Sequence, residues 1–223
     1  MIAALFVDET GPYVGLDGVE PWGVTKDARL YRGPWPVVAH PPCERWGRYA
    51  TGGPRADPSK PGFQPRKKVG DDHGCFDAAL LAVLTWGGVL EHPEASKAWT
   101  VFGINTPPRG GGWVHAGLQG GWTCCVEQGW YGHPARKATW LYASGVVLPE
   151  LRWGDSGQRL VGGIGGSRLA GADPGTEAYA VRRRIGVMAC LPKSQRHITP
   201  VAFRDVLLSM ARTASFAQRQ TAP

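Results

Sequence analysis

The chain has 223 residues, of which 43% are hydrophobic, and it carries a formal net charge of +7. This length fits one sizeable domain, and no apolar run reaches the length of a membrane span, so we expect no contact with a membrane. The excess of positive charge favours a polyanionic partner, and we therefore expect the protein to bind nucleic acid.

The first predicted elements are strands and a loop. Residues 2–18 alternate apolar and polar side chains and turn at Glu9-Thr10-Gly11, a pattern that predicts a β-hairpin. Residues 34–40 predict a short apolar strand of the kind that is buried in a parallel sheet. Residues 51–70 are rich in glycine, proline and positive charge, which indicates a surface loop.

The middle of the chain alternates helices with strands. A helix is predicted over residues 71–87, with Asp71 or Asp72 as its N-cap and glycines at its end. A buried strand is predicted over residues 87–92, and a short helix opened by Pro93 follows it.

The remaining predicted elements are two strands and a closing helix. The strands are expected over residues 121–128 and 138–144. The amphipathic helix is expected over residues 199–214, with Thr199 as its N-cap and Pro200 at its first position. Strands that alternate with helices predict an α/β fold with a mainly parallel sheet and flanking helices.

We expect three regions along the chain. Residues 1–143 are predicted to form a catalytic α/β core, and residues 144–196 an irregular insert that could serve as a reduced substrate-recognition region. Residues 197–223 are predicted to form a closing helix that packs on the core and a disordered tail.

A cysteine and a glutamate directly follow two of the predicted strands. Cys43 comes after an apolar strand and two prolines, and Glu91 ends the next apolar strand. Ligands of α/β sheets bind at the carboxyl ends of parallel strands, so the two side chains are candidates for one site. A structural explanation is also open, because prolines make a rigid exit from a strand, cysteine packs as a small hydrophobe, and a glutamate can be a capping acid.

The order of these motifs resembles the cytosine-5 DNA methyltransferase family. In that family one strand ends in Pro-Pro-Cys and the next in Glu-Asn-Val, and here Pro41-Pro42-Cys43 and Glu91 stand at similar places. Tyr131-Gly132-His133-Pro134 is similar to a later family motif. With His40 before the prolines, the chain also resembles short methyltransferase-like proteins of phages. The resemblance covers most of residues 35–212.

The resemblance implies a Rossmann-like methyltransferase-type fold, abbreviated at its amino-terminal end, and an enzyme that modifies cytosine in DNA. It implies that Cys43 is the nucleophile that attacks carbon 6 of the base and that Glu91 is the general acid at ring nitrogen 3. The base would have to be flipped out of a duplex, and S-adenosylmethionine is the implied methyl donor. The predicted substrate-binding residues are His40, Pro42, Arg45, His92, Arg136 and Lys137.

The chain departs from the family at two motifs. The glycine-rich loop that binds S-adenosylmethionine is replaced by Leu5-Phe6-Val7-Asp8-Glu9-Thr10-Gly11, so the sequence defines no cofactor-binding residues. Residues 162–171 copy the glycines, but no clear strand precedes them. In the later motif, the family's Gln and two Arg positions are Ala135, Lys137 and Thr139.

Two other functions stay open. The thiol could modify a base or a free nucleotide with a different donor, or the protein could be an inactive methyltransferase relative that only binds nucleic acid. We expect no metal site, because no Cys-x-x-Cys pair is present and His92-Pro93-Glu94 lacks the Pro-Cys-x-x-Cys of zinc deaminases. The odd count of five cysteines and the absence of a signal-peptide pattern predict a cytoplasmic protein, in the host cytoplasm if a phage encodes it.

Overall fold

The computed structural model describes residues 1–47, 50–51, 58–59, 61, 63, 67–158, 191 and 193–215. Several predicted features lie outside these residues. They are most of the loop predicted over residues 51–70, most of the insert with its glycine cluster at 162–171, and the tail after residue 215.

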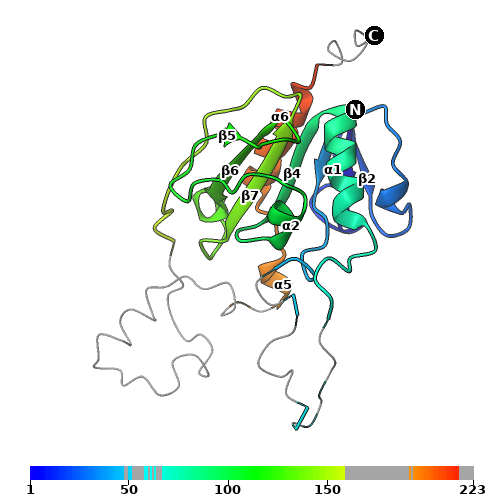
Figure 1. Ribbon diagram of the computed structural model, residues 1–223. Helices are drawn as coiled ribbons and strands as arrows, with labels where there is room; N and C mark the ends of the chain where they lie inside the picture. Colours follow the sequence, from blue (N-terminus) through cyan, green and yellow to red (C-terminus); the bar gives the residue numbers. More distant parts are fainter. Residues whose placement is uncertain are drawn as a thin grey trace.

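A seven-stranded sheet forms the centre of the protein (Figure 1). Its strands lie in the order β2-β1-β3-β4-β7-β6-β5. The strands are β1 Ile2–Leu5, β2 Val19–Trp22, β3 Val37–Ala39, β4 Gly88–Pro93, β5 Val114–His115, β6 Trp122–Glu127 and β7 Ala138–Ser144. The apolar runs that predict strands at β3, β4, β6 and β7 are thereby confirmed.

The sheet is mixed, so the α/β class is confirmed but the mainly parallel sheet is not. Parallel pairing joins β2, β1, β3 and β4. In the other half, β7 runs antiparallel to both β4 and β6, and β5 runs antiparallel to β6. A parallel pair needs a long crossover, and the connection from β6 to β7 is only residues 128–137, which favours antiparallel pairing.

The β-hairpin predicted over residues 2–18 does not form. β1 and β2 pair in parallel, with Ile2 opposite Val19, and residues 6–18 are the loop between them. Within this loop Tyr13 is only 2% exposed and packs in the core. The alternating pattern therefore reflects a loop that buries some of its side chains, rather than a second antiparallel strand.

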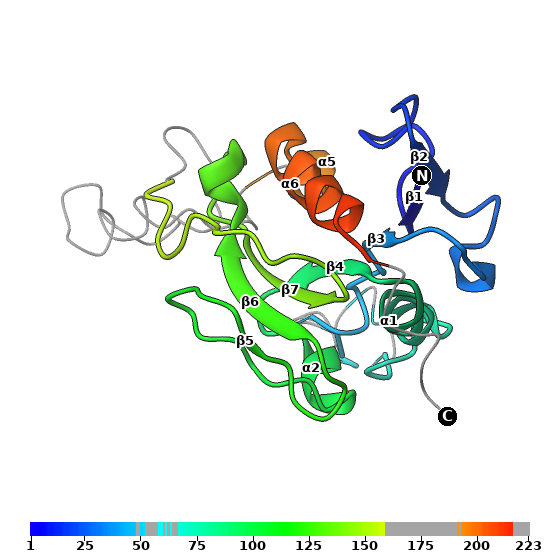
Figure 2. The same cartoon turned by 90° about the horizontal axis from the view of Figure 1, so that it is seen from above.

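Helices cover both faces of the sheet (Figure 2). On one face lie α1, Cys75–Trp86, and α2, Lys97–Val101, and on the other lies α6, Val201–Arg212. The shorter helical segments are η1 Ala28–Leu30, η2 Gln128–Tyr131 and α5 Lys193–Arg196. In the described part of the chain, no helix combines the length and the apolarity that crossing a bilayer would require.

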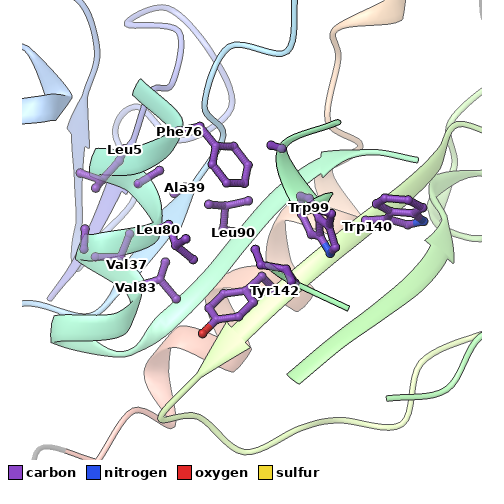
Figure 3. Packing of buried hydrophobic residues seen from close by; sticks show 14 of the residues in the cluster. Leu5, Val37, Ala39, Phe76, Leu80, Val83, Leu90, Trp99, Trp140 and Tyr142 are labelled. Carbon is purple, nitrogen blue, oxygen red and sulfur yellow. The ribbon is translucent and has the colours of Figure 1, made fainter. Parts of the chain in front are cut away.

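The strands divide their side chains between two cores, one on each face of the sheet. In β1, for example, Leu5 joins the cluster with α1 and α2, whereas Ala4 joins the cluster with α6. Figure 3 shows the first cluster, where Phe76 of α1 and Trp99 of α2 pack over the central strands. Because both faces of β3 and β4 are covered, the ends of these two strands are held at fixed positions.

Asp72 fixes the start of α1. Its carboxylate accepts the backbone N–H of Gly74 at 3.0 Å and that of Phe76 at 2.8 Å. It also accepts the indole Nε1–H of Trp46 at 2.7 Å. Of the two predicted N-cap residues, Asp72 therefore accepts hydrogen bonds from the free N–H groups at the start of α1, and Asp71 does not. The N-cap position itself is Gly74.

The other two helices begin at different residues from those predicted. Ser96, not Pro93, caps α2 by accepting the N–H of Ala98 at 3.2 Å, while Pro93 ends β4. Pro200 occupies the N-cap position of α6, where Thr199 is predicted. The apolar side of α6 packs against the sheet as its amphipathic pattern predicts.

Candidate active site

The exits of β3 and β4 lie side by side at the carboxyl end of the parallel half of the sheet. The register pairs Ala39 with Leu90, so the next residues along each strand, His40 and Glu91, are neighbours. Cys43 follows His40 after the two prolines. On its other side β4 pairs with β7, which brings the start of β7 to the same place.

Both oxygens of the Glu91 carboxylate have hydrogen-bond partners. His40 Nδ1 lies 3.1 Å from Oε2, and Gln128 Nε2 donates to Oε1 at 3.0 Å. Burial alone would raise the pKa of Glu91, but the hydrogen bond and charge of His40, then the charges of Lys137 and His92, lower this pKa to about 2. Glu91 is therefore ionised near neutral pH.

A chain of buried polar groups orients this carboxylate. The hydroxyl of Tyr13 lies 2.7 Å from His40 Nε2, and burial raises the pKa of Tyr13, so the phenol keeps its proton. Nδ1 of His40 is the ring nitrogen that faces Glu91, so a proton on Nδ1 makes the imidazole a hydrogen-bond donor to this carboxylate. On the opposite side, Gln128 Nε2 also donates to Thr139 Oγ1 at 2.9 Å.

Cys43 and Lys137 act electrostatically on each other and on Glu91. Burial raises the pKa of the Cys43 thiol, the charge of Glu91 raises it further, and the charge of Lys137 lowers it. Burial lowers the pKa of the Lys137 amine, and the charges of Glu91 and Cys43 oppose that shift. Cys43 therefore rests as a thiol rather than a thiolate. The Glu91 cluster is defined as Tyr13, His40, Cys43, Glu91, Gln128, Lys137 and Thr139.

Three predicted substrate-binding residues are placed in different surroundings. His92 is fully buried and stacks on Trp99 with ring centroids 6.2 Å apart, and burial lowers the pKa of its imidazole to about 4. It therefore belongs to the core rather than to an open surface. Pro42 is exposed. Arg45 is half-buried, and its Nη1 is fully buried with no hydrogen-bond partner among the described residues.

Arg136 lies outside the Glu91 cluster, although it is next to Lys137 in the sequence. Its Nε donates to Glu127 Oε1 at 2.8 Å and lies 3.8 Å from Asp155 Oδ1. Glu127 also accepts the N–H of Ser156 at 2.8 Å. Arg136, a predicted substrate-binding residue, thus holds the segment after β7 against the end of β6.

Sequence reasoning misses three members of the cluster, which are Tyr13, Gln128 and Thr139. Gln128 carries a usable signal, because a polar amide directly after an apolar strand is the same signal that indicates Glu91. Thr139 stands where the resembled family has an arginine, but its own hydroxyl is unremarkable in sequence. Tyr13 carries no signal, since the pattern around it predicts a hairpin.

The exit of β1 does not fit S-adenosylmethionine. A cofactor that contacts backbone closely needs glycines at this point, but Phe6 follows β1 directly, with a positive φ of 59°. The Glu9 carboxylate accepts the N–H and the hydroxyl of Thr25, both at 2.7 Å. The Glu9 side chain also packs directly against Gly23, because a Cβ added at Gly23 would lie only 2.5 Å from Glu9 Cγ. The chain's own side chains thus occupy the space between the exits of β1 and β2.

A metal centre is not evident in the part of the chain that the structure describes. Within the described ranges, no group of three or more His, Cys, Asp or Glu side chains is arranged to hold a metal ion. Cys43, Cys75, Cys124 and Cys125 are free thiols.

Comparisons of this chain with protein-family models, with curated proteins and with solved structures give no match. The case for a function therefore rests on the chemistry of the Glu91 cluster.

Proposed function

We propose that this protein modifies cytosine in DNA through a covalent bond between Cys43 and the base. The observation that carries the proposal is the parallel pairing of β3 with β4, which puts Cys43, after the end of β3, near Glu91, which lies in β4 just beyond the residues that pair with β3. The two are close enough for the charge of Glu91 to raise the pKa of the thiol. A nucleophile and a carboxylate in one partly buried place are what addition to a cytosine ring requires. The same placement supports an abbreviated Rossmann-like methyltransferase-type fold.

In the proposed reaction, the sulfur of Cys43 forms a bond to carbon 6 of cytosine. The electron pair of the double bond between carbons 5 and 6 shifts toward nitrogen 3, and the proton lost by the thiol ends on that nitrogen. Glu91, as an ionised acceptor facing nitrogen 3, carries this proton. Carbon 5 is then nucleophilic, takes one hydrogen from water and releases another before the sulfur leaves. Without a donor, the net result is exchange of the carbon 5 hydrogen with solvent.

The donor and the partner follow less directly from the site. S-adenosylmethionine is the donor that the family resemblance suggests, but the exit of β1 does not fit it, so the proposed chemistry consists of addition and exchange, which need no donor. A DNA partner is supported by the net charge of +7. A target base would reach Cys43 only when it is unpaired or flipped out.

The proposal is tested by incubating the protein with cytosine-containing oligonucleotides, single-stranded and duplex, in heavy water, and weighing the oligonucleotide by mass spectrometry. We expect the wild type to add deuterium at carbon 5 and Cys43→Ser to add none. Cys75→Ser is the matched control, because Cys75 is also a half-buried free thiol but lies at the start of α1. A parallel sample with S-adenosylmethionine would gain the mass of a methyl group if that donor is used.

Two results would contradict the proposal. The first is equal deuterium uptake in the wild type and in Cys43→Ser, which would show that the thiol takes no part. The second is the absence of uptake in every sample while DNA is bound.

Binding without chemistry is the second candidate function. It is favoured by the raised pKa of the Cys43 thiol, since a resting thiol is a weak nucleophile. For such a module, Cys43→Ser should bind DNA as tightly as the wild type, as measured by fluorescence anisotropy, and neither protein should exchange the carbon 5 hydrogen.

A further inference from the structure

Four cations lie on the chain segments that meet beside Cys43, and the proposed reaction does not use them. They are Arg45, Lys67, Lys68 and Lys97, and together they are called the Trp46 rim. We propose that the Trp46 rim binds the phosphate backbone of the nucleic-acid strand whose unpaired base reaches Cys43. This inference deepens the proposed function and rests on it for the class of ligand.

The turn that carries the thiol is joined to two other segments by main-chain hydrogen bonds. The carbonyl oxygen of Cys43 accepts the N–H of Trp46 at 3.0 Å, which closes the turn. The carbonyl oxygen of Arg45 accepts the N–H of Gly70 at 3.0 Å, and that of Trp46 accepts the N–H of Lys97 at 2.8 Å. The segment that leads to Gly70 and the start of α2 therefore both lie against the turn that carries Cys43.

The buried ring of Trp46 fixes this arrangement. It is only 3% exposed and packs on Phe76 and Phe102, with ring centroids 5.6 and 5.8 Å apart. Its indole N–H donates to Asp72 at 2.7 Å, and a Cβ added at Gly70 would lie 2.9 Å from Trp46 Cη2. The main chain beneath the rim is therefore part of the core, so the rim is in place before a ligand binds.

The rim cations lack the acidic partners that several other cations have. In the ranges that the structure describes, none of the four is in an ion pair, whereas ion pairs hold Lys26, Arg29, Arg109, Arg136 and Arg204. The exposed acids of residues 43–47, 67–71 and 96–97 are Glu44 and Asp71, which are fewer than the cations. A surplus of positive charge therefore surrounds the thiol and attracts an anion.

The placement of the rim fits phosphate in particular. Lys67 and Lys68 are exposed, and Arg45 and Lys97 are half-buried nearer the thiol. Phosphate groups link each nucleotide to its neighbours, so a base at Cys43 brings the adjacent phosphates close to the rim. Lysine and arginine side chains bind phosphate oxygens through charge-assisted hydrogen bonds, and such contacts fix the position of a strand without reading its sequence.

The test is binding of the full chain to a fluorescent single-stranded oligonucleotide and to an abasic strand of the same length, measured by anisotropy over a salt series. In the double variant Lys67→Gln with Lys68→Gln, we expect the affinity for both strands near 0.1 M salt to fall about tenfold. The slope of log affinity against log salt should become shallower by about 1.4, which is about 0.7 for each phosphate contact on a single strand. Both lysines are exposed, so thermal unfolding should be unchanged.

The double variant Lys26→Gln with Arg212→Gln is the matched control, because it removes the same charge from two exposed cations outside the rim. Lys26 is paired with Glu20. Arg212 ends α6, where the chain runs on to Gly87 at the opposite end of β4 from the site. We expect this control to keep the wild-type slope. An equal change of slope in the two double variants would mean that the overall charge acts, and it would overturn the role of the rim.

The abasic strand separates this inference from the proposed function. If the rim variant binds the abasic strand more weakly but no sample exchanges the cytosine hydrogen, the rim stands and the function proposed for Cys43 fails. If the wild type exchanges this hydrogen and the rim variant does so with an unchanged KM, the function stands and the rim is overturned. A polyglutamate peptide of equal charge that competes as well as the abasic strand would also overturn the inference, because an acidic protein would then be the partner.

Discussion

Glu91 stays ionised although it is buried, because His40 and Gln128 each supply a hydrogen-bond donor to one of its oxygens. A buried carboxylate without such partners would hold a proton instead. Its neighbours therefore determine what Glu91 can do: it accepts hydrogen bonds and carries protons that other groups supply. A proton at ring nitrogen 3 has to originate elsewhere, and in the proposed reaction the Cys43 thiol supplies it.

The depressed pKa of Glu91 makes stability depend on pH in a defined window. The pKa falls from 4.5 to about 2 on folding, so the stabilisation is complete above pH 4.5 and is lost as the pH falls toward 2. We expect Glu91→Gln to lower the free energy of unfolding by roughly 2–3 kcal/mol near neutral pH. Urea denaturation at a series of pH values should show this deficit shrinking below pH 4.5. A deficit that stays constant with pH would mean that ionisation of Glu91 does not stabilise the fold.

At the scale of elements, the site depends on how strands and helices end. His40 and Glu91 are neighbours because β3 and β4 are in register, and α1, which connects these strands, begins at the carboxylate of Asp72. Asp72 also accepts the indole N–H of Trp46, just after Cys43 in the chain. The start of α1 and the segment that carries the thiol are thus tied to one carboxylate.

Removal of this carboxylate should destabilise the protein strongly. Asp72→Ala leaves three N–H donors without their acceptor, two of them in buried surroundings, and we expect a loss of about 2–3 kcal/mol in the free energy of unfolding. Asp71→Ala is the matched control, because Asp71 is exposed, and it should change stability by no more than about 0.5 kcal/mol. Equal effects of the two substitutions on urea denaturation would contradict the role of Asp72.

At the scale of the whole molecule, the charge of +7 predicts DNA binding that weakens steeply with salt. The two arginines near the site should differ. Arg45 is half-buried and follows Cys43 closely in the chain, so the remaining exposed part of its guanidinium can contact a phosphate, and Arg45→Ala should reduce the slope of log affinity against log salt by about one. Arg136 is already bound to Glu127, so Arg136→Ala should leave the slope unchanged. Fluorescence anisotropy over a salt series measures the slope for both variants. A larger change of slope for Arg136→Ala than for Arg45→Ala would contradict the prediction that Arg45 is the arginine that contacts DNA.

The sequence predicts those parts of the fold that local patterns determine. The apolar runs at β3 and β4 are unambiguous, and they place Cys43 after β3 and Glu91 on the neighbouring strand, although β4 continues past Glu91 to Pro93. β2 escapes prediction because it contains Pro21, which is tolerated there since β2 lies at the edge of the sheet. The direction of β7 is not predictable from the sequence either, because an apolar strand has the same pattern whether its neighbours run parallel or antiparallel.

The candidate site is predictable only where one residue stands out by itself. A thiol after two prolines and a carboxylate after an apolar strand are visible in sequence. His92 shows that a residue next to a site residue in the sequence need not belong to the site. It follows Glu91, but successive side chains of a strand point to opposite faces of the sheet, so His92 is buried against Trp99. The contact of Tyr13 with His40 depends on the path of a loop, and no periodic pattern encodes that path.

The position of β7 in the sheet affects how readily the chain aggregates during its synthesis. β4 lies between β3 and β7, and its residues Gly88, Val89 and Leu90 are buried on completion of the sheet. Until residues 138–144 have left the ribosome, one side of β4 is an open row of backbone donors and acceptors flanked by apolar side chains. Such an edge pairs readily with other chains. Nascent or prematurely terminated chains that end between β4 and β7 should therefore be the aggregation-prone forms of this protein.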